Sequence, residues 1–257
     1  ERWIKKLNDP LVSIIIVNWN GGEVMRRCIK SLSKMSYEKW ELIVVDNGSG
    51  DGSESIAANF KLIKNQTNLG FAHANNQGLK KARGKYVLLL NNDTKVVPDF
   101  LSKLVKRIEQ DDSIGVIQPK IFLMDRPGYL DNAGSFLTRI GFLHHWGFGQ
   151  KDGQEFNQER EIFSAKGACM LIRREVVEKV GLFDDDFFSY FEESDFCWRV
   201  WLGGWRVLFY PKTHIYHKLG YTIRRLNLKE LTYLYYKNRI CSHTKNLDGI
   251  NFIFILI

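Results

Sequence analysis

The alternation of apolar runs with helix-like segments through residues 1–120 most constrains how this chain can fold. Runs with the composition of buried strands lie at residues 12–17, 40–45, 60–64, 86–90 and 114–118. Between them the spacing predicts helices at residues 23–35, 53–59, 72–82 and 98–110, the last with Pro98 at its first position. Strands and helices that alternate in this way are typical of an α/β fold with a mostly parallel, doubly wound, Rossmann-like sheet and helices on both faces.

The pattern changes after the fifth strand. Residues 125–161 are rich in Gly, Asp and aromatic side chains and predict loops and hairpins over one end of the sheet. Helices are predicted at residues 175–180 and 192–202, each followed by glycine, and a strand at residues 206–210 that ends at Pro211. We see no internal repeat, low-complexity tract or linker, so a single domain over residues 1–245 is expected.

The composition is that of a globular protein with a basic surface. The 257 residues are 44% hydrophobic and 26% charged, and the net charge is +8. No finger, homeodomain or RNP-type signature appears, so we expect no nucleic-acid partner. A basic, aromatic segment over residues 221–257 indicates either contact with a membrane surface or an ordinary solvated face; its cations are Arg224, Arg225, Lys229, Lys237, Arg239 and Lys245.

The cysteines and the chain ends suggest a compartment. The four cysteines are scattered, without a C-x-x-C pair, as in reduced thiols of an intracellular protein. Residues 1–10 are charged and have no apolar core, so no signal peptide is expected there. Residues 250–257 are almost wholly apolar and too short to span a bilayer; they are either the start of a membrane helix or a final core element.

Polar clusters follow four of the predicted strands, at residues 18–22, 46–51, 65–70 and 91–93. Ligands of parallel sheets bind beyond the carboxyl ends of the strands, so these clusters would form one polar rim suited to a base and ribose. Neither a P-loop nor a G-x-G-x-x-G motif follows the first strand. A diphosphate would therefore need another counter-charge, which a divalent metal at Asp93 would supply.

The order of eight segments resembles glycosyltransferase family 2, a family with the GT-A fold, and within it the rhamnosyltransferase-like branch. The resemblance covers roughly residues 10–245. Its segments are VSIIIVNWN at 12–20, VVDNGS at 44–49, NLGFA at 68–72, LLLNND at 88–93, GACMLIR at 167–173, VGLFD at 180–184, FFSYFEESDFCWR at 187–199 and HKLG at 217–220.

The resemblance implies roles for individual residues. Residues 10–120 would bind the nucleotide sugar and residues 121–220 the acceptor. Asp93 would hold Mn²⁺ or Mg²⁺, His217 would be a further contact to the metal or the pyrophosphate, and Gly167 and Ala168 would lie on the acceptor side. Trp146, in the irregular middle, is a candidate for stacking on a sugar. The donor would contact Val17, Asn18, Asn20, Asp46, Asn47, Asn68, Gly70, Asn75, Asn91 and Asn92, with Asp46 suiting uracil or thymine equally.

Two departures from the family pattern bear on the chemistry. The first position of the D-x-D motif is Asn91, so only one carboxylate is present there. The acidic pair is Glu192-Glu193 instead of Glu-Asp, which leaves the general base open among Glu192, Glu193 and Asp195. Glu192 and Asp195 should share a helix face while Glu193 points elsewhere. We expect the helix N-terminus to keep Glu193 ionised.

The resemblance thus implies an inverting, metal-dependent transferase for cell-envelope glycans. It would move a sugar from a UDP- or dTDP-sugar to a hydroxyl of a glycan or lipid-linked acceptor. A cytoplasmic site at the inner face of the cell membrane is expected. Two other readings stay open: a nucleotidyltransferase that makes nucleotide sugars, disfavoured because residues 18–22 hold no basic side chain, and a non-catalytic sugar- or nucleotide-binding module.

Overall fold

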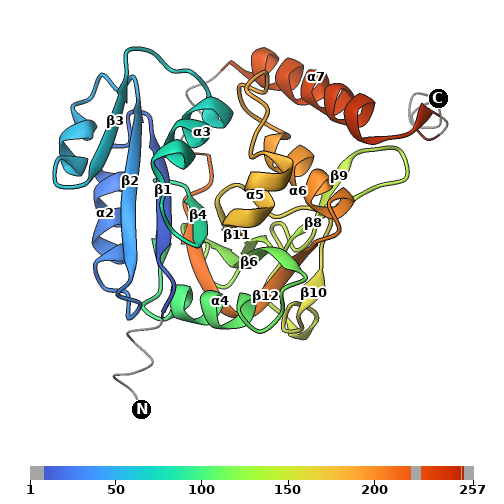
Figure 1. Ribbon diagram of the computed structural model, residues 1–257, viewed down its shortest axis with the longest axis horizontal. Helices are drawn as coiled ribbons and strands as arrows, with labels where there is room; N and C mark the ends of the chain where they lie inside the picture. The colour runs from blue at the N-terminus through green and yellow to red at the C-terminus, as the bar shows by residue number, and fades with distance from the viewer. Residues whose placement is uncertain (1–8, 221–226, 250, 252–257) are drawn as a thin grey trace.

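The computed structural model of this chain describes residues 9–220, 227–249 and 251. Figure 1 shows a central sheet with helices packed on both faces. Along the chain the elements are β1 (Val12–Asn18), α2 (Gly22–Leu32), β2 (Trp40–Asn47), the 3₁₀ helix Ser53–Ala57, β3 (Lys61–Asn65), α3 (Phe71–Lys81), β4 (Tyr86–Leu90), β5 (Thr94–Val96), α4 (Phe100–Ile108), β6 (Ile114–Leu123), β7 (Leu130–Asn132), β8 (Ser135–Leu137), β9 (Leu143–His145), the 3₁₀ helix Gln154–Phe156, β10 (Arg160–Glu161), β11 (Cys169–Arg173), α5 (Arg174–Val180), α6 (Glu192–Leu202), β12 (Arg206–His217) and α7 (Leu228–Asn246).

The sheet brings the strands of the first half together in parallel. Its order is β10-β12-β6-β11-β4-β1-β2-β3, and β4, β1, β2 and β3 pair in parallel. All five residues of β4 are buried, because apolar side chains on both of its faces are covered by helices. The predicted α/β fold with helices on both faces is confirmed.

Two apolar cores lie on opposite faces of the sheet. Successive residues of β1 divide between them, because side chains alternate across a strand. Ile14 and Ile16 pack in the core that includes α2 and α4, whereas Ile15 packs in the core that includes α3, α5 and α6. The sheet is therefore the middle layer between two cores, and the polar clusters lie at the carboxyl ends of its strands.

The second half of the chain completes the sheet and its loops. β11 lies between β4 and β6 and is antiparallel to both, and β12 runs parallel to β6. β5 pairs antiparallel with the end of β12, so that Thr94 lies opposite His217. The loops and hairpins predicted for residues 125–161 are present as β7, the β8–β9 hairpin and short turns. This pairing brings residues far apart in sequence to the end of β4.

Several predicted boundaries were wrong. The strand expected at residues 114–118 continues as β6 to Leu123, and the helix expected at residues 23–35 ends at Leu32. Pro98 does not begin α4; it precedes the helix, and its carbonyl accepts a hydrogen bond from the N–H of Ser36 at 2.8 Å. Pro211 does not end β12, which continues to His217. The register of β12 against β6 shifts between Tyr210 and His214, and such irregular positions tolerate the missing N–H of proline.

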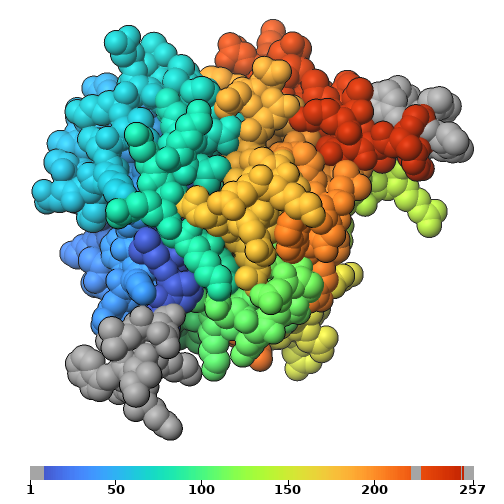
Figure 2. Space-filling model, viewed as in Figure 1, coloured from blue at the N-terminus to red at the C-terminus, as the bar shows by residue number. Residues whose placement is uncertain are grey.

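The C-terminal helix α7 packs against α6 and supports the loop before it. Asn238 is buried and its Nδ2 donates to the carbonyls of Ser189 and Tyr190 at 3.0 and 2.7 Å. Figure 2 shows α7 along the upper edge of the molecule. In the part of the chain that the structure describes, no helix is both long and apolar enough to cross a membrane. The predictions for residues 1–8, Arg224, Arg225 and the apolar stretch 250–257, except Asn251, lie outside that part.

Candidate active site

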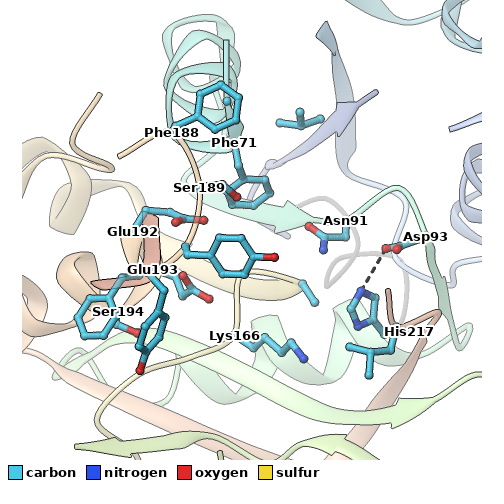
Figure 3. Close-up of a pocket in the computed structure, with 18 of the residues that line it drawn as sticks. Phe71, Asn91, Asp93, Lys166, Phe188, Ser189, Glu192, Glu193, Ser194 and His217 are labelled. Atoms are coloured by element: carbon cyan, nitrogen blue, oxygen red, sulfur yellow. Dashed lines mark ion pairs between the residues drawn. The ribbon is translucent and has the colours of Figure 1, made fainter. Parts of the chain in front are cut away.

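A cavity of about 410 Å³ opens at the carboxyl ends of β1 and β4. The polar ends of the strands form one wall, and the start of α6 with the loop before it forms the opposite wall. Figure 3 shows Asp93 and His217 on one side of this pocket, and Glu192 and Glu193 on the other. Two groups of predicted residues that are far apart in sequence therefore share one pocket.

Twelve of the residues singled out in the sequence line this cavity. From the donor set they are Val17, Asn47, Asn68, Gly70, Asn91 and Asn92. From the metal, catalytic and acceptor sets they are Asp93, His217, Glu192, Glu193, Gly167 and Ala168. They come from both halves of the chain, so the cavity exists only because the sheet joins those halves.

Asn18 and Asp46 lie beneath the pocket wall and do not line the cavity. Asn18 is fully buried, and its Nδ2 donates to Asp46 Oδ1 at 2.8 Å. Its Oδ1 accepts from Asn92 Nδ2 at 3.0 Å, which ties this network to a residue that does line the cavity. Ser49 also donates to Asp46, and the side-chain oxygen of Asn20 accepts from the N–H of Gly50 at 2.8 Å.

Two further predicted residues do not line the cavity. Asn75 is buried in α3 and donates to the carbonyl of Phe71 at 2.9 Å. Trp146 packs against Phe156 and Phe209, with ring centroids 4.9 and 5.6 Å apart. Its indole thus belongs to the apolar core, which explains why the sequence alone could not separate a stacking role from a packing role.

Asp195 does not line the cavity either. It is fully buried and accepts from Arg199 Nε at 3.0 Å and from Asn246 Nδ2 at 2.9 Å. Glu192 and Glu193 both line the cavity, whereas Asp195 does not.

Glu192 and Glu193 form a desolvated acidic pair. One oxygen of each, Oε2, is buried and has no hydrogen-bond partner among the described residues. Burial and the neighbouring charge of Glu193 raise the pKa of Glu192 well above its usual value. Burial also raises the pKa of Glu193, although the backbone N–H groups of Glu193 and Gly167 and the charge of Lys166 oppose that rise. Desolvation is the largest effect on the pKa of Glu193, and the backbone N–H groups at the start of α6 act against it.

The opposite side of the cavity holds a chain of charges. His217 Nε2 lies 3.2 Å from Asp93 Oδ1, and His217 Nδ1 lies 2.7 Å from Asp131 Oδ2. Lys166 Nζ donates to Asp131 Oδ1 at 2.6 Å. Burial would lower the pKa of His217, but Asp131 and Asp93 raise it to about 9. Burial would raise the pKa of Asp131, but His217 and Lys166 lower it.

A strained turn sets the direction of α6. Tyr190 and Phe191 have φ angles of 72° and 71°, a region that non-glycine residues seldom adopt. Such strain persists only where surrounding contacts hold it, and Asn238 of α7 binds the carbonyl of Tyr190. This turn delivers the first residues of α6 to the cavity, so α7 contributes to the site through the loop that it supports.

The sequence analysis missed Asp131 and Lys166. Asp131 lies in β7, inside the segment that was predicted only as loops and hairpins. Lys166 lies immediately before Gly167 and lines the cavity between the two groups of acids. A weak signal existed for both, because Asp131-Asn-Ala-Gly134 is a polar, glycine-containing run and Lys166 adjoins a segment that had been singled out.

A family model and two curated relatives match this chain. The model described as Glycosyl transferase family 2 matches residues 13–181. An uncharacterized protein, y4gI, of Sinorhizobium fredii is 30% identical over 81% of this chain and 24% of its own length. The low-salt glycan biosynthesis hexosyltransferase Agl10 of Haloferax volcanii is 28% identical over 74% of this chain and 61% of its own length. The chain thus spans less than two thirds of either relative.

Two solved structures share the arrangement of the elements. GalNAc-T7, crystallised with UDP, GalNAc and Mn²⁺, superposes with a TM-score of 0.68 at 20% identity, over 82% of this chain and 44% of that one. The mannosyltransferase PcManGT from Pyrobaculum calidifontis, in complex with GDP-Man and Mn²⁺, gives a TM-score of 0.65 at 19% identity, over 99% of this chain and 72% of that one. At these identities the likeness concerns the fold alone.

Proposed function

The chain belongs to glycosyl transferase family 2 and has the GT-A fold, and from this premise we propose that it is an inverting glycosyltransferase. It would transfer a sugar from a nucleoside-diphosphate sugar to a hydroxyl of a glycan or lipid-linked acceptor. One observation carries the proposal: a single cavity has Asp93 and His217 on one side and the Glu192–Glu193 pair on the other. Separated anion-binding and base groups are what such a transfer needs.

We propose that the polar strand ends bind the nucleoside, with UDP or dTDP as the carrier. Asn68 and Asn91 would offer amide groups to a ribose and base in the cavity, and Asn47 holds Asn68 in place by donating from Nδ2 to its Oδ1 at 2.8 Å. Asp46 does not line the cavity; it accepts a hydrogen bond from Asn18, which lies next to the cavity wall. Asp46 would reach a pyrimidine only after a local rearrangement. GalNAc-T7 was crystallised with UDP, which supports a uridine donor, whereas PcManGT binds GDP-Man.

The residues at Asp93 fit a divalent cation, Mn²⁺ or Mg²⁺. Asp93 Oδ1 is buried and has no hydrogen-bond partner among the described residues, although His217 Nε2 lies within ion-pair distance. In the described part of the chain, no group of three or more His, Cys, Asp or Glu side chains could hold a metal. Asp93 and His217 would hold the ion together with donor oxygens, and the bound ion would neutralise the charge that grows on the leaving diphosphate.

We assign the general base to Glu193, with Glu192 as its protonated neighbour. Two adjacent buried carboxylates resist double ionisation, so one of them keeps a proton. The N–H of Gly167 and the charge of Lys166 favour the ionised form of Glu193, whereas Glu192 has the charge of Glu193 beside it. Glu193 would accept the proton of the acceptor hydroxyl as that oxygen attacks the anomeric carbon.

We propose that the acceptor enters past α7, from a membrane surface at the inner face of the cell membrane. Ile140 at the hairpin tip and Tyr236 and Ile240 of α7 are 62%, 45% and 45% exposed. Phe142 links the two elements, because its ring centroid lies 6.2 Å from that of Tyr236. Tyr235 of the same helix lines the cavity. The free cysteines support a reducing compartment such as the cytoplasm.

We also propose that the transferred sugar is of the rhamnosyl type.

A sedimentation assay tests the membrane contact. We expect the protein to pellet with phosphatidylglycerol vesicles, and Ile140→Ser combined with Ile240→Ser to weaken pelleting. Leu202→Ser is the matched control, because Leu202 is 65% exposed at the far end of α6. Equal pelleting of all three proteins, or no pelleting of the unchanged protein, would contradict the contact.

The transferase proposal is tested by a panel of nucleotide sugars with Mn²⁺ or Mg²⁺. A donor that binds the folded state raises the melting temperature by mass action. Incubation with the best ligand should then release free nucleoside diphosphate. Release of pyrophosphate would favour a nucleotidyltransferase instead, and binding without any release would favour a non-catalytic module.

A further inference from the structure

Asp131 makes two strong contacts yet does not itself line the cavity. It lies in β7 and is 0% exposed. Its Oδ1 accepts from Lys166 Nζ at 2.6 Å and its Oδ2 lies 2.7 Å from His217 Nδ1. Both of these partners line the cavity. The two carboxylate oxygens are thus used entirely to hold groups that face the pocket.

The contacts of Asp131 fix the orientation of His217. A carboxylate only accepts hydrogen bonds, so the ring nitrogen that faces Asp131 carries a proton. The other nitrogen, Nε2, is then directed at Asp93, whose Oδ1 lies 3.2 Å away. Carboxylates behind metal-binding histidines act in this way, setting the tautomer and the ring angle.

The same carboxylate also anchors Lys166. Lys166 is 22% exposed and extends between the Glu192–Glu193 pair and His217. Without Asp131, this ammonium group would lose the hydrogen bond that keeps it at this point of the pocket. Breaking such a pair leaves a partly buried charge without its partner, which is costly. Asp131 therefore links the placement of two pocket groups that come from β12 and from the loop before β11.

We propose that Asp131 is a positioning residue of the donor site. It holds Nε2 of His217 toward Asp93 and holds Lys166 in the pocket, so that cation and diphosphate meet a prearranged set of groups. The inference rests on the proposed function, because it concerns the same cavity. It goes further by assigning a role to a residue that never touches the donor.

The test measures Mn²⁺ affinity in the presence of UDP, by paramagnetic resonance of free Mn²⁺. We expect Asp131→Asn to weaken Mn²⁺ affinity by about 10- to 100-fold, because an amide can donate to Nδ1 and so turn the protonated nitrogen toward Asp93. His217→Gln should weaken it at least as much. In the His217→Gln background, Asp131→Asn should weaken the affinity less than it does alone, because only the part of its effect that passes through Lys166 remains.

A matched control separates positioning from general damage. Asp152→Asn also breaks a lysine–aspartate pair, since Asp152 Oδ1 lies 2.7 Å from Lys120 Nζ, and neither residue lines the cavity. We expect this variant to keep the Mn²⁺ affinity of the unchanged protein. If Asp131→Asn does not fold, Lys166→Met is added to restore charge balance, and affinity is compared with that of Lys166→Met alone.

The outcomes distinguish this inference from the proposed function. Unaltered affinity in Asp131→Asn, or full additivity with His217→Gln, would overturn the positioning role while leaving the transferase proposal intact. Absence of Mn²⁺ binding to the unchanged protein with UDP and also with dTDP would overturn both.

Discussion

At the scale of single residues, the two glutamates at the start of α6 are neighbours in sequence but unequal in surroundings. Glu193 lies near the backbone of Gly167 and the charge of Lys166, and both oppose the effect of burial on its pKa. Neither Gly167 nor Lys166 lowers the pKa of Glu192, and the charge of the neighbouring Glu193 raises it. Two like carboxyl groups with different environments are the usual basis for dividing acid and base roles.

Glu193→Gln should lower turnover by about 10²- to 10⁴-fold and leave donor binding unchanged. An amide cannot take up the acceptor proton, and general base catalysis contributes about 10²- to 10⁴-fold to rate. Single-turnover kinetics measure the loss, and calorimetry with UDP and Mn²⁺ measures the donor affinity. An active Glu193→Gln beside an inactive Glu192→Gln or Asp195→Asn would show that the base was assigned to the wrong residue.

Glu192→Gln should stabilise the fold at neutral pH. The pKa of Glu192 is raised in the folded state, so its contribution to stability is complete below the unfolded pKa and is lost as pH rises through the folded value. Gln carries no charge at any of these pH values, so we expect the free energy of unfolding of the variant at neutral pH to be higher by on the order of 1 kcal/mol. Urea unfolding from pH 4 to pH 8 measures it, and a gain that grows on acidification would contradict the prediction.

At the scale of elements, Glu41 ties three strands and a loop together at the amino end of the sheet. Ser13 of β1 and Lys61 of β3 both donate to its carboxylate at 2.7 Å, and the N–H of Arg83 donates at 2.8 Å. Burial would raise the pKa of Glu41, but these hydrogen bonds lower it to about 2.

Glu41→Gln should therefore destabilise the protein in a pH-dependent way. Because the folded pKa is lowered, the contribution of Glu41 is present above the unfolded pKa near 4.5 and is lost as pH falls toward 2. At pH 7 we expect a loss of about 2 to 3 kcal/mol. Chemical denaturation at pH 7 and pH 3 measures the difference, and a constant loss at both pH values would refute the carboxylate's role.

The start of α3 depends on Gly70, which packs against Phe188 in the loop before α6. Gly70 has a φ of 88°, and a Cβ there would lie 2.4 Å from the carbonyl oxygen of Phe188. Gly70→Ala should destabilise the protein by about 1 to 3 kcal/mol and raise the KM for the donor, because the backbone at Phe188 must move to make room for the methyl group. Gly128→Ala is the control, since Gly128 has a φ of 79° but open space around it. Similar effects from both changes would mean that φ alone is responsible.

The strands of the first half could be predicted because buried strands consist of continuous runs of apolar residues. β4 is apolar at every position, and its predicted bounds are those observed. The continuation of β12 past Pro211 could not be predicted, because its partner β5 is only three residues long and pairs through tertiary contact. The pocket-facing direction of Glu192 depends on the turn at Tyr190 and Phe191, which no local pattern indicates.

The same limits apply to the site. The position of Asp93 at a strand end predicts a metal there, whereas His217 is identified only by resemblance to a family segment; the sheet brings the two side chains within 3.2 Å of each other. Asp131 lies in a segment without periodicity, so its importance appears only when its two partners are seen. Trp146 was selected for its residue type, and packing against Phe156 places it outside the cavity.

At the scale of the whole molecule, the cavity lies where the two halves of the chain meet. The parallel strands supply the polar rim, and β12, α6 and α7 supply His217, the acidic pair and Tyr235. We propose residues 10–120 as the donor half and 121–220 as the acceptor half. α7 belongs with this unit, because Asn246 and Asn238 attach it to α6 and to the loop before it.

The most direct test is a calorimetric titration of UDP and dTDP, with Mn²⁺ present, into the unchanged protein, Asp93→Ala and Glu193→Gln. We expect at least one nucleotide to bind the unchanged protein and Glu193→Gln with similar affinity, and to lose measurable binding in Asp93→Ala or after chelation of the metal. Equal affinity in Asp93→Ala would contradict a cation-held diphosphate at the end of β4.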